Sequence, residues 1–208
     1  KNKILTPNWL CYKKVIKLFQ LEVEILRFSD TDIVIKPSDE GSSIGLSVVK
    51  DFDPQNESKR TILDDSISKC YEVSDNVMIE EYIHGRELTV GILGNKILPI
   101  VEIVPKNSFY DYDCKYIKGK SDYIVPAMQI SKDLEINIYN NAMRIYELIG
   151  CRHYARIDFR LSRDNKPYFL EVNTLPGFTD TSLFPMAAKA AGISYKNLLM
   201  KIIDLAKK

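Results

Sequence analysis

The chain has 208 residues, of which 45% are hydrophobic and 27% charged, and its formal net charge is +1. That length is enough to bury a core, as one large domain or two small ones, and the composition is ordinary for a globular protein. The near-neutral charge gives no indication of a nucleic-acid partner or a strongly acidic one. No apolar run approaches the ~18 residues of a membrane-spanning helix, so no membrane partner is expected.

Four scattered cysteines, at positions 11, 70, 114 and 151, show no metal-binding spacing. This favours reduced thiols over a disulfide framework and, together with the lack of a recognisable signal peptide, a cytoplasmic protein. The sequence begins with lysine rather than methionine, so we expect it to be a piece of a longer protein.

Hydrophobic periodicity and the positions of glycine and proline predict the elements in chain order. In the first part we expect a loop at 6–9, a short helix around 12–20, strands at 32–36 and 45–49 on either side of a loop at 37–43, a helix at 57–73 and a strand at 77–82. A soft boundary near residues 75–78 would separate a small glycine-loop subdomain, residues 1–77, from a larger one, residues 78–208.

The second part is predicted in the same way. We expect strands at 87–93 and 97–104 turned by Gly94-Asn95, a long polar loop at 105–125, a helix at 134–149 stopped by Gly150, strands at 154–161 and 168–173, and helices at 182–191 and 196–207. Hairpins mixed with helices, rather than a strict strand–helix alternation, indicate an α+β fold.

The last two predicted strands carry the strongest chemical signal. Side chains two residues apart on a strand share a face, so Arg156 points with Asp158, and Glu171 with Asn173. The turn residues at 164–167 predict a hairpin, which would bring all four side chains together. Each residue alone would be an ordinary surface charge. Together, the carboxylate and amide oxygens are hard ligands that suit Mg²⁺, and they predict a metal site.

The loop after Lys36 is a second signal, with the sequence E-G-S-S-I-G at residues 40–45. Glycine lets backbone N–H groups approach phosphate oxygens without a Cβ in the way, and Lys36 adds a positive charge. The loop is not a Walker A motif, because it lacks G-K-[ST]. An ordinary hairpin turn with a surface lysine is the alternative.

Three further features stay open on the residues alone. Glu80-Glu81 fits a charged strand end. The aromatic and charged segment at 109–116 fits either a strand with one apolar face or a functional loop. His84 and His153 have no partner pattern, and we expect neither to take part in chemistry.

The sequence resembles a known family. R-I-D-F at 156–159, followed by L-E-V-N-T-L-P-G-F-T-x-x-S-L-x-P from residue 170, is similar to the D-alanine–D-alanine ligases, a branch of the ATP-grasp enzymes. The resemblance runs from about residue 30 to the C-terminus. It implies an ATP-grasp fold, with ATP between two α+β subdomains under a glycine-rich loop and a mobile lid. It also implies a two-step ligation: one D-alanine carboxylate attacks the γ-phosphate of ATP, and the amine of a second D-alanine then displaces phosphate.

The resemblance implies a set of nucleotide contacts. These are Lys36 and Lys115 for the phosphates, Glu80, Glu81 and Ile83 for the adenine, and Glu87 for the ribose hydroxyls. Lys115 belongs to a segment with the family's F-Y-D-Y-x-x-K-Y pattern, which closes over the site. An ionised carboxylate such as Glu87 can accept hydrogen bonds from two neighbouring hydroxyls.

The resemblance also implies the metal and substrate contacts. These are Asp158, Glu171 and Asn173 as ligands of two Mg²⁺ ions, with Mn²⁺ as an alternative, Arg156 to stabilise the developing charge, and Ser42, Tyr116, Gly177 and Ser182 to hold and select the D-alanine substrates. In the family, tyrosine at the place of Tyr116 accompanies dipeptide formation, which favours D-alanine as the second substrate.

Members of the family also have an N-terminal domain with a glutamate that contacts the first D-alanine, and a further phosphate-binding lysine shortly before the stretch equivalent to Thr6-Pro7. Neither residue can be placed in this sequence. Two alternatives therefore stay open beside a D-alanine–D-alanine ligase. One is an ATP-binding module that is inactive alone and needs a partner, either an N-terminal domain or a second copy in a homodimer. The other is a variant ligase that joins D-alanine to D-lactate or D-serine.

Overall fold

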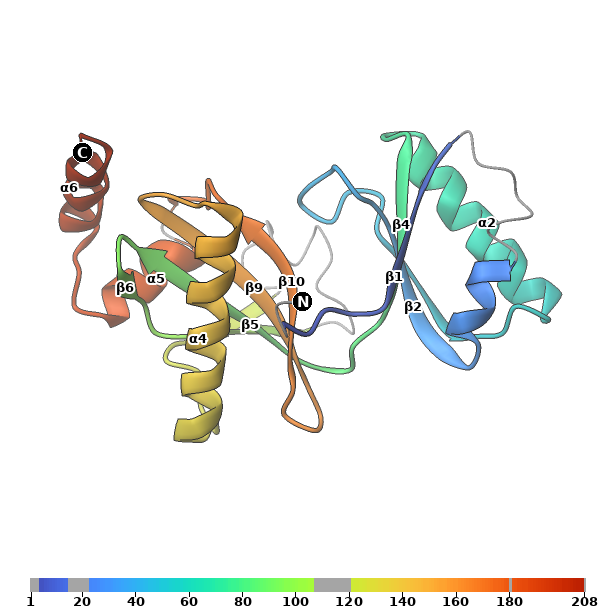
Figure 1. Cartoon of the computed structure of the whole chain (residues 1–208), viewed down its shortest axis with the longest axis horizontal. Helices are drawn as coiled ribbons and strands as arrows, with labels where there is room; N and C mark the ends of the chain where they lie inside the picture. Colours follow the sequence, from blue (N-terminus) through green and yellow to red (C-terminus); the bar gives the residue numbers. More distant parts are fainter. Residues whose placement is uncertain (1–3, 15–22, 107–120, 180, 208) are drawn as a thin grey trace. The chain divides into compact units, whose positions relative to one another are not determined.

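The computed structural model describes residues 4–14, 23–106, 121–179 and 181–207 (Figure 1). The strands are β1 (Trp9–Lys13), β2 (Thr31–Pro37), β3 (Ser47–Phe52), β4 (Asn76–Glu81), β5 (Gly85–Leu93), β6 (Lys96–Ile97), β7 (Val101–Pro105), β8 (Ser121–Ile124), β9 (Tyr154–Ser162) and β10 (Pro167–Asn173). The helices are η1 (Ile25–Phe28), α2 (Glu57–Tyr71), α4 (Lys132–Ile149), α5 (Leu183–Ala190) and α6 (Tyr195–Ala206). Among these helices, none has the length and apolarity needed to cross a membrane.

The described chain divides into two units, each built on an antiparallel sheet. The sheet A unit contains residues 7–14 and 23–82, with strand order β1-β4-β2-β3. The sheet B unit contains residues 4–6, 83–106, 121–179 and 181–207, with strand order β10-β9-β5-β7-β8 and β6 paired to β5. Two antiparallel sheets with helices make an α+β fold, which is what the sequence predicts.

The division falls after Tyr82, whereas the sequence analysis places the boundary after residue 77. The strand β4 accounts for the difference. It pairs with β1 and with β2, so its hydrogen bonds keep residues 78–81 in sheet A.

Sheet A has one apolar face and one mixed face. Ile33 and Ile35 of β2 and Ile79 of β4 belong to a buried cluster that includes residues of α2 and η1. Because side chains alternate along a strand, Lys36 of β2 and Glu80 of β4 lie on the opposite face. The alternation thus separates the core of this unit from Lys36 and Glu80.

Sheet B is organised in the same way. Alternate residues of β5 and β9 pack against Ile138, Ala142 and Ile145 of α4, which lies across this face of the sheet (Figure 1). The strand residues in this cluster are Leu88, Val90, Ile92, Ala155, Ile157, Phe159 and Leu161. The residues between them in sequence point to the other face. That second face carries the candidate metal-binding residues.

The sequence-based prediction of secondary structure is wrong at three places. Residues 9–13 form β1, whose exposure alternates with period two, so residues 12 and 13 are in a strand rather than at the start of the helix predicted around 12–20; residues 15–22 lie outside the described part of the chain. The single strand predicted at 97–104 is split into β6 and β7 on either side of Pro99, which has no N–H to donate to a ladder. The end of the predicted loop at 105–125 is β8, which pairs with β7.

Candidate functional site: a polar cluster on sheet B

The hairpin β9–β10 brings the four predicted side chains together. Asp158 lies directly opposite Glu171, and Arg156 directly opposite Asn173. Asn173 Nδ2 donates to Asp158 Oδ2 at 3.0 Å and to Glu171 Oε1 at 3.1 Å. The predicted hairpin and its grouping of side chains are therefore present, whereas the roles of these residues remain predictions.

A β-bulge sets the direction of Glu171. Phe169 pairs with Phe159, but Glu171 pairs with Asp158, so Leu170 is an extra residue in β10. Phe169 packs on the α4 face. In a regular strand Glu171 would follow it onto that face, because the two residues are two apart. The bulge reverses the alternation and turns Glu171 toward the polar face, which is a common use of bulges near functional sites.

The Asp158 carboxylate accepts hydrogen bonds from three side chains. Arg156 donates to both of its oxygens, from Nε at 2.9 Å and from Nη2 at 2.8 Å. Thr89 of β5 donates to Oδ1 at 2.6 Å, and Asn173 completes the set. The Asp158 side chain is only 11% exposed. A bidentate arginine and two further donors stabilise its charged form, since burying an unpaired carboxylate would be costly.

This donor set fits a divalent cation. Asp158 and Glu171 supply hard carboxylate oxygens, and the amide nitrogen of Asn173 donates to both of them. A half-turn of that amide would present its oxygen to the same place. In the described part of the chain no group of three or more His, Cys, Asp or Glu side chains is arranged to hold a metal. Two carboxylates with an amide are in keeping with Mg²⁺, which usually uses one or two protein carboxylates and takes its other ligands from phosphate and water.

In the sheet A unit, two of the predicted nucleotide-binding residues contact each other. Lys36 Nζ donates to Glu80 Oε1 at 2.6 Å, with side chains 26% and 11% exposed. Glu81 lies on the opposite side of β4 from Glu80, and its carboxylate accepts from Asn8 Nδ2 at 3.0 Å. Only Glu80 therefore shares a face with Lys36, and Glu81 can contribute to that face through its backbone alone.

The loop after Lys36 has an unusual backbone. Ser42 and Ser43 both have positive φ angles, 57° and 59°, a conformation that most residues with a side chain avoid. Gly45 has φ 70°, and a Cβ there would lie 3.1 Å from the Pro37 ring. Residues held in such conformations are often found at ligand-binding loops. The backbone conformation of the loop is therefore compatible with phosphate binding, and the substrate-binding role of Ser42 stays a prediction.

Glu87 and Ile83 of the sheet B unit are connected by an arginine that the sequence analysis did not select. Arg160 of β9 donates from Nε to the Ile83 carbonyl at 3.1 Å and from Nη1 to Glu87 Oε2 at 3.3 Å. A signal for it was present in the sequence, because 156, 158 and 160 share one face of the strand. The sequence analysis also did not select Thr89, for which the same kind of signal was present, because Glu87 and Thr89 are two residues apart on β5 and share one face.

Gly177 and Ser182, the predicted holders of the second amino acid, also approach each other. A Cβ at Gly177 would lie 2.8 Å from Ser182 Oγ, so the hydroxyl occupies the space that any other residue would need. Ser182 Oγ accepts from the Thr179 N–H at 2.9 Å and lies at the start of α5. Lys115 and Tyr116 lie outside the described residues, as does the segment at 109–116.

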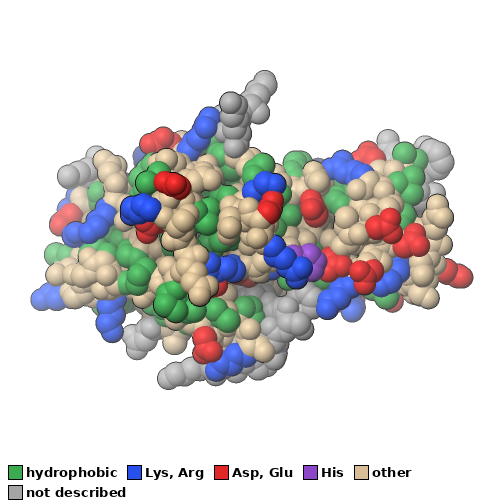
Figure 2. Space-filling view, turned by 90° about the horizontal axis from the view of Figure 1, so that it is seen from below, with side chains coloured by type: hydrophobic (Ala, Val, Ile, Leu, Met, Phe, Trp, Pro, Cys, Tyr) green, Lys and Arg blue, Asp and Glu red, His purple; other side chains and the backbone are tan. Residues whose placement is uncertain are grey.

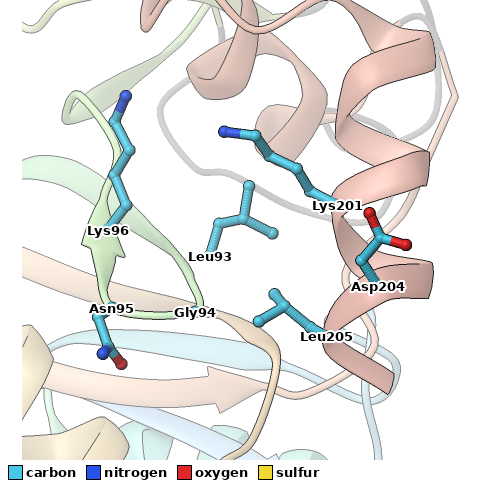
Figure 3. Close-up of a pocket in the computed structure, with 7 residues that line it drawn as sticks. All are labelled: Leu93, Gly94, Asn95, Lys96, Lys201, Asp204 and Leu205. Carbon is cyan, nitrogen blue, oxygen red and sulfur yellow. The ribbon is translucent and has the colours of Figure 1, made fainter. Parts of the chain in front are cut away.

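A pocket lies elsewhere in the sheet B unit. It measures about 490 Å³ and is lined by Leu93, Gly94, Asn95, Lys96, Lys201, Asp204 and Leu205 (Figure 3). The Leu205 side chain of α6 points toward the turn at Gly94, and none of the predicted site residues is among the lining residues. On the face drawn in Figure 2, basic and acidic side chains are interspersed, in line with the net charge of +1.

Comparison with known proteins identifies the family. The model of the "D-ala D-ala ligase C-terminus" matches residues 13–204. A D-alanine–D-alanine ligase of Halalkalibacterium halodurans is 41% identical over 200 residues, which cover 93% of this chain and 63% of that protein. The chain therefore spans less than two thirds of this relative's length.

Two solved structures support the same assignment. The D-alanine–D-alanine ligase of Bacillus anthracis complexed with ATP gives a TM-score of 0.73 at 31% identity, covering 97% of this chain and 59% of that one. The VanG D-Ala:D-Ser ligase of Enterococcus faecalis gives 0.81 at 30% identity, covering 98% and 57%. Both the sequence motifs and the fold agree with these matches. The chain belongs to the D-alanine–D-alanine ligase family and corresponds to its C-terminal, ATP-grasp part.

Proposed function

We propose that this chain is the ATP-binding and catalytic part of an ATP-dependent D-alanine–D-alanine ligase. The observation that carries the proposal is the cluster of Asp158, Glu171, Asn173 and Arg156 on one face of sheet B, with its bulge and its four-donor carboxylate. The similarity to curated D-alanine–D-alanine ligases supports the choice of reaction.

In this proposal Asp158, Glu171 and Asn173 would hold Mg²⁺. When bound, the ion would supply positive charge against the phosphate oxygens of ATP. The Asp158 partners Thr89 and Arg156 fix the direction of the carboxylate. Arg156 also presents a permanent positive charge next to the metal ligands, where negative charge develops during transfer of the phosphoryl group. No protein nucleophile is needed, so catalysis rests on positioning and charge neutralisation.

The remaining predicted residues would bind the substrates. Lys36, the loop containing Ser42, and Lys115 would contact the phosphates; Glu80, Glu81 and Ile83 the adenine; Glu87 the ribose; and Ser42, Tyr116, Gly177 and Ser182 the two D-alanine molecules. The Lys36–Glu80 ion pair means that a phosphate must compete with a carboxylate for this lysine. The structure of the B. anthracis relative in complex with ATP supports nucleotide binding by this part of the family.

A second candidate is a ligase that uses D-serine as the second substrate. It is favoured by the TM-score of 0.81 with VanG, which exceeds that of the ATP-complexed D-alanine–D-alanine ligase. Sequence identity points the other way, at 30% for VanG and 41% for the H. halodurans ligase. We therefore keep D-alanine as the second substrate.

A chimeric ligase tests the proposal. The C-terminal part of the H. halodurans ligase is replaced by the corresponding part of this chain, and products from ATP, Mg²⁺ and D-alanine are identified by mass spectrometry, with D-serine and D-lactate as competitors. We expect D-alanyl-D-alanine as the main product. The isolated chain should bind Mg·ATP but form little dipeptide, because the family's N-terminal substrate contacts are not supplied. A folded chimera that binds ATP and forms only mixed products would overturn the choice of D-alanine.

A further inference from the structure

Arg160 occupies a central place on the polar face of sheet B. It lies two residues beyond Asp158 on β9 and directly opposite Glu87 in the β5–β9 ladder. Its side chain is 14% exposed, and that of Glu87 is 15% exposed. Both charged groups are thus largely shielded from water. In such surroundings each of them helps to stabilise the other.

Two contacts of Arg160 go to chemically different groups. Nε holds the backbone carbonyl of Ile83, which precedes β5, and Nη1 holds the carboxylate of Glu87, which lies within β5. The planar guanidinium presents its donors in a fixed fork, so these two acceptors are kept at a set separation. A lysine has a single nitrogen and cannot impose that separation.

We propose that Arg160 is a positioning residue for nucleotide recognition, which holds the Ile83 backbone and the Glu87 carboxylate at the spacing between the base and the ribose. The inference rests on the proposed function, in which Ile83 lies at the adenine and Glu87 at the ribose. Arg160 acts through these two groups. Without it, the Glu87 carboxylate would lose the guanidinium that fixes its direction and its distance from the Ile83 carbonyl.

This role has a consequence that a purely structural role lacks. A hydrogen bond from a ribose hydroxyl to a charged carboxylate contributes roughly tenfold or more to affinity. If Arg160 positions Glu87 for that bond, removal of Arg160 should weaken the binding of ATP more than the binding of 2′,3′-dideoxy-ATP, which has no ribose hydroxyls to donate. If Arg160 only stabilises the fold, both nucleotides should weaken by the same factor.

The test is a calorimetric titration of the chain with ATP and with 2′,3′-dideoxy-ATP, both in Mg²⁺. For the unmodified chain we expect ATP to bind about tenfold or more tightly than the dideoxy compound. Arg160→Met and Glu87→Gln should each reduce this ratio to about threefold or less. Arg160→Lys keeps a cation beside Glu87 and should fold even if the methionine variant does not; it should give an intermediate ratio.

Arg86→Met is the matched control. Arg86 lies on the same strand as Glu87 but points to the other face, where it forms a bidentate pair with Glu102 at 2.7 and 2.6 Å. Its removal should leave the ratio unchanged. If both Arg160 variants keep the same ratio of ATP to 2′,3′-dideoxy-ATP affinity as the unmodified chain, the inference is overturned. Equal affinity of the unmodified chain for the two nucleotides would also overturn it, because Glu87 would then make no bond to the ribose hydroxyls. That result would still be compatible with nucleotide binding by this chain. Only a chain that binds neither nucleotide would contradict the proposed function itself.

Discussion

Replacing Thr89 by valine should weaken the polar cluster of sheet B without changing its shape. Thr89 is 1% exposed, and its hydroxyl donates to Asp158 Oδ1 at 2.6 Å. Valine has the same branched outline but cannot donate. The substitution therefore removes one of the donors to a buried carboxylate and leaves Arg156 and Asn173 in place.

The size of the effect follows from the charge of the acceptor. A hydrogen bond to a charged group contributes about 1.5–3 kcal/mol, and the donors that remain place the expected loss near the lower end, at about 1.5–2 kcal/mol. At about 2–4 °C per kcal/mol for a chain of this size, the melting temperature of the sheet B unit should fall by roughly 3–8 °C. If Asp158 binds metal, the loss of a partner that orients this ligand should also weaken Mn²⁺ binding by roughly 10–100-fold.

Differential scanning calorimetry measures the first effect, and titration with Mn²⁺ in the presence of ATP measures the second. Thr61→Val is the control, because the Thr61 hydroxyl makes an exposed bond to the Glu57 carbonyl on α2. Its effect on stability should stay within about 0.5 kcal/mol. Equal stability of Thr89→Val and the unmodified chain would refute the stabilising role of this bond. A loss of stability with unchanged Mn²⁺ affinity would refute the link to the metal.

Three other substitutions test separate parts of the structure. Gly85→Ala should destabilise the sheet B unit by about 3 kcal/mol or more, because a Cβ there would lie 1.9 Å from a backbone carbonyl of β9, whereas Gly41→Ala, with nothing within 4 Å, should be nearly neutral in urea unfolding. Burial raises the pKa of the Cys70 thiol from 9.0 to about 11, so its contribution to stability is complete below pH 9 and is lost as the pH rises toward 11; unfolding of the Cys70→Ala variant should show less of this decline, and an identical decline would contradict it. Glu80→Gln should tighten binding of inorganic tripolyphosphate several-fold, because Lys36 no longer pairs with a carboxylate, and unchanged affinity would mean that this ion pair does not compete with phosphate.

Much of the candidate site could be predicted because it depends on local periodicity. A period of two placed Arg156 with Asp158 and Glu171 with Asn173, and the turn at 164–167 joined the two pairs in one hairpin. The helix stop at Gly150 was equally local: the residue has φ 74° and follows the last turn of α4. Such features are set by residues close together in the sequence.

Features that depend on distant partners could not be predicted in this way. The bulge at Leu170 arises from the register between β9 and β10 and is invisible in a single strand. The helix predicted around 12–20 overlaps the end of β1, because the partner of this strand is β4, more than sixty residues away. Thr89 and Arg160 each share a strand face with a predicted site residue, but their contacts with Asp158 and Glu87 cross to the neighbouring strand and appear only when β5 and β9 are paired.

The most direct test of the proposed metal site is the Mg²⁺ dependence of ATP binding in the Glu171→Gln variant. Calorimetric titrations with and without Mg²⁺ are compared with those of the unmodified chain and of Glu135→Gln, a control on α4 whose carboxylate accepts from Lys132 and Tyr139. Glu171→Gln should weaken Mg·ATP binding by about tenfold or more and metal-free ATP binding by much less, since the carboxylate acts through the cation. Glu135→Gln should change neither. An equal loss for Glu171→Gln with and without Mg²⁺ would show that Glu171 does not bind the metal.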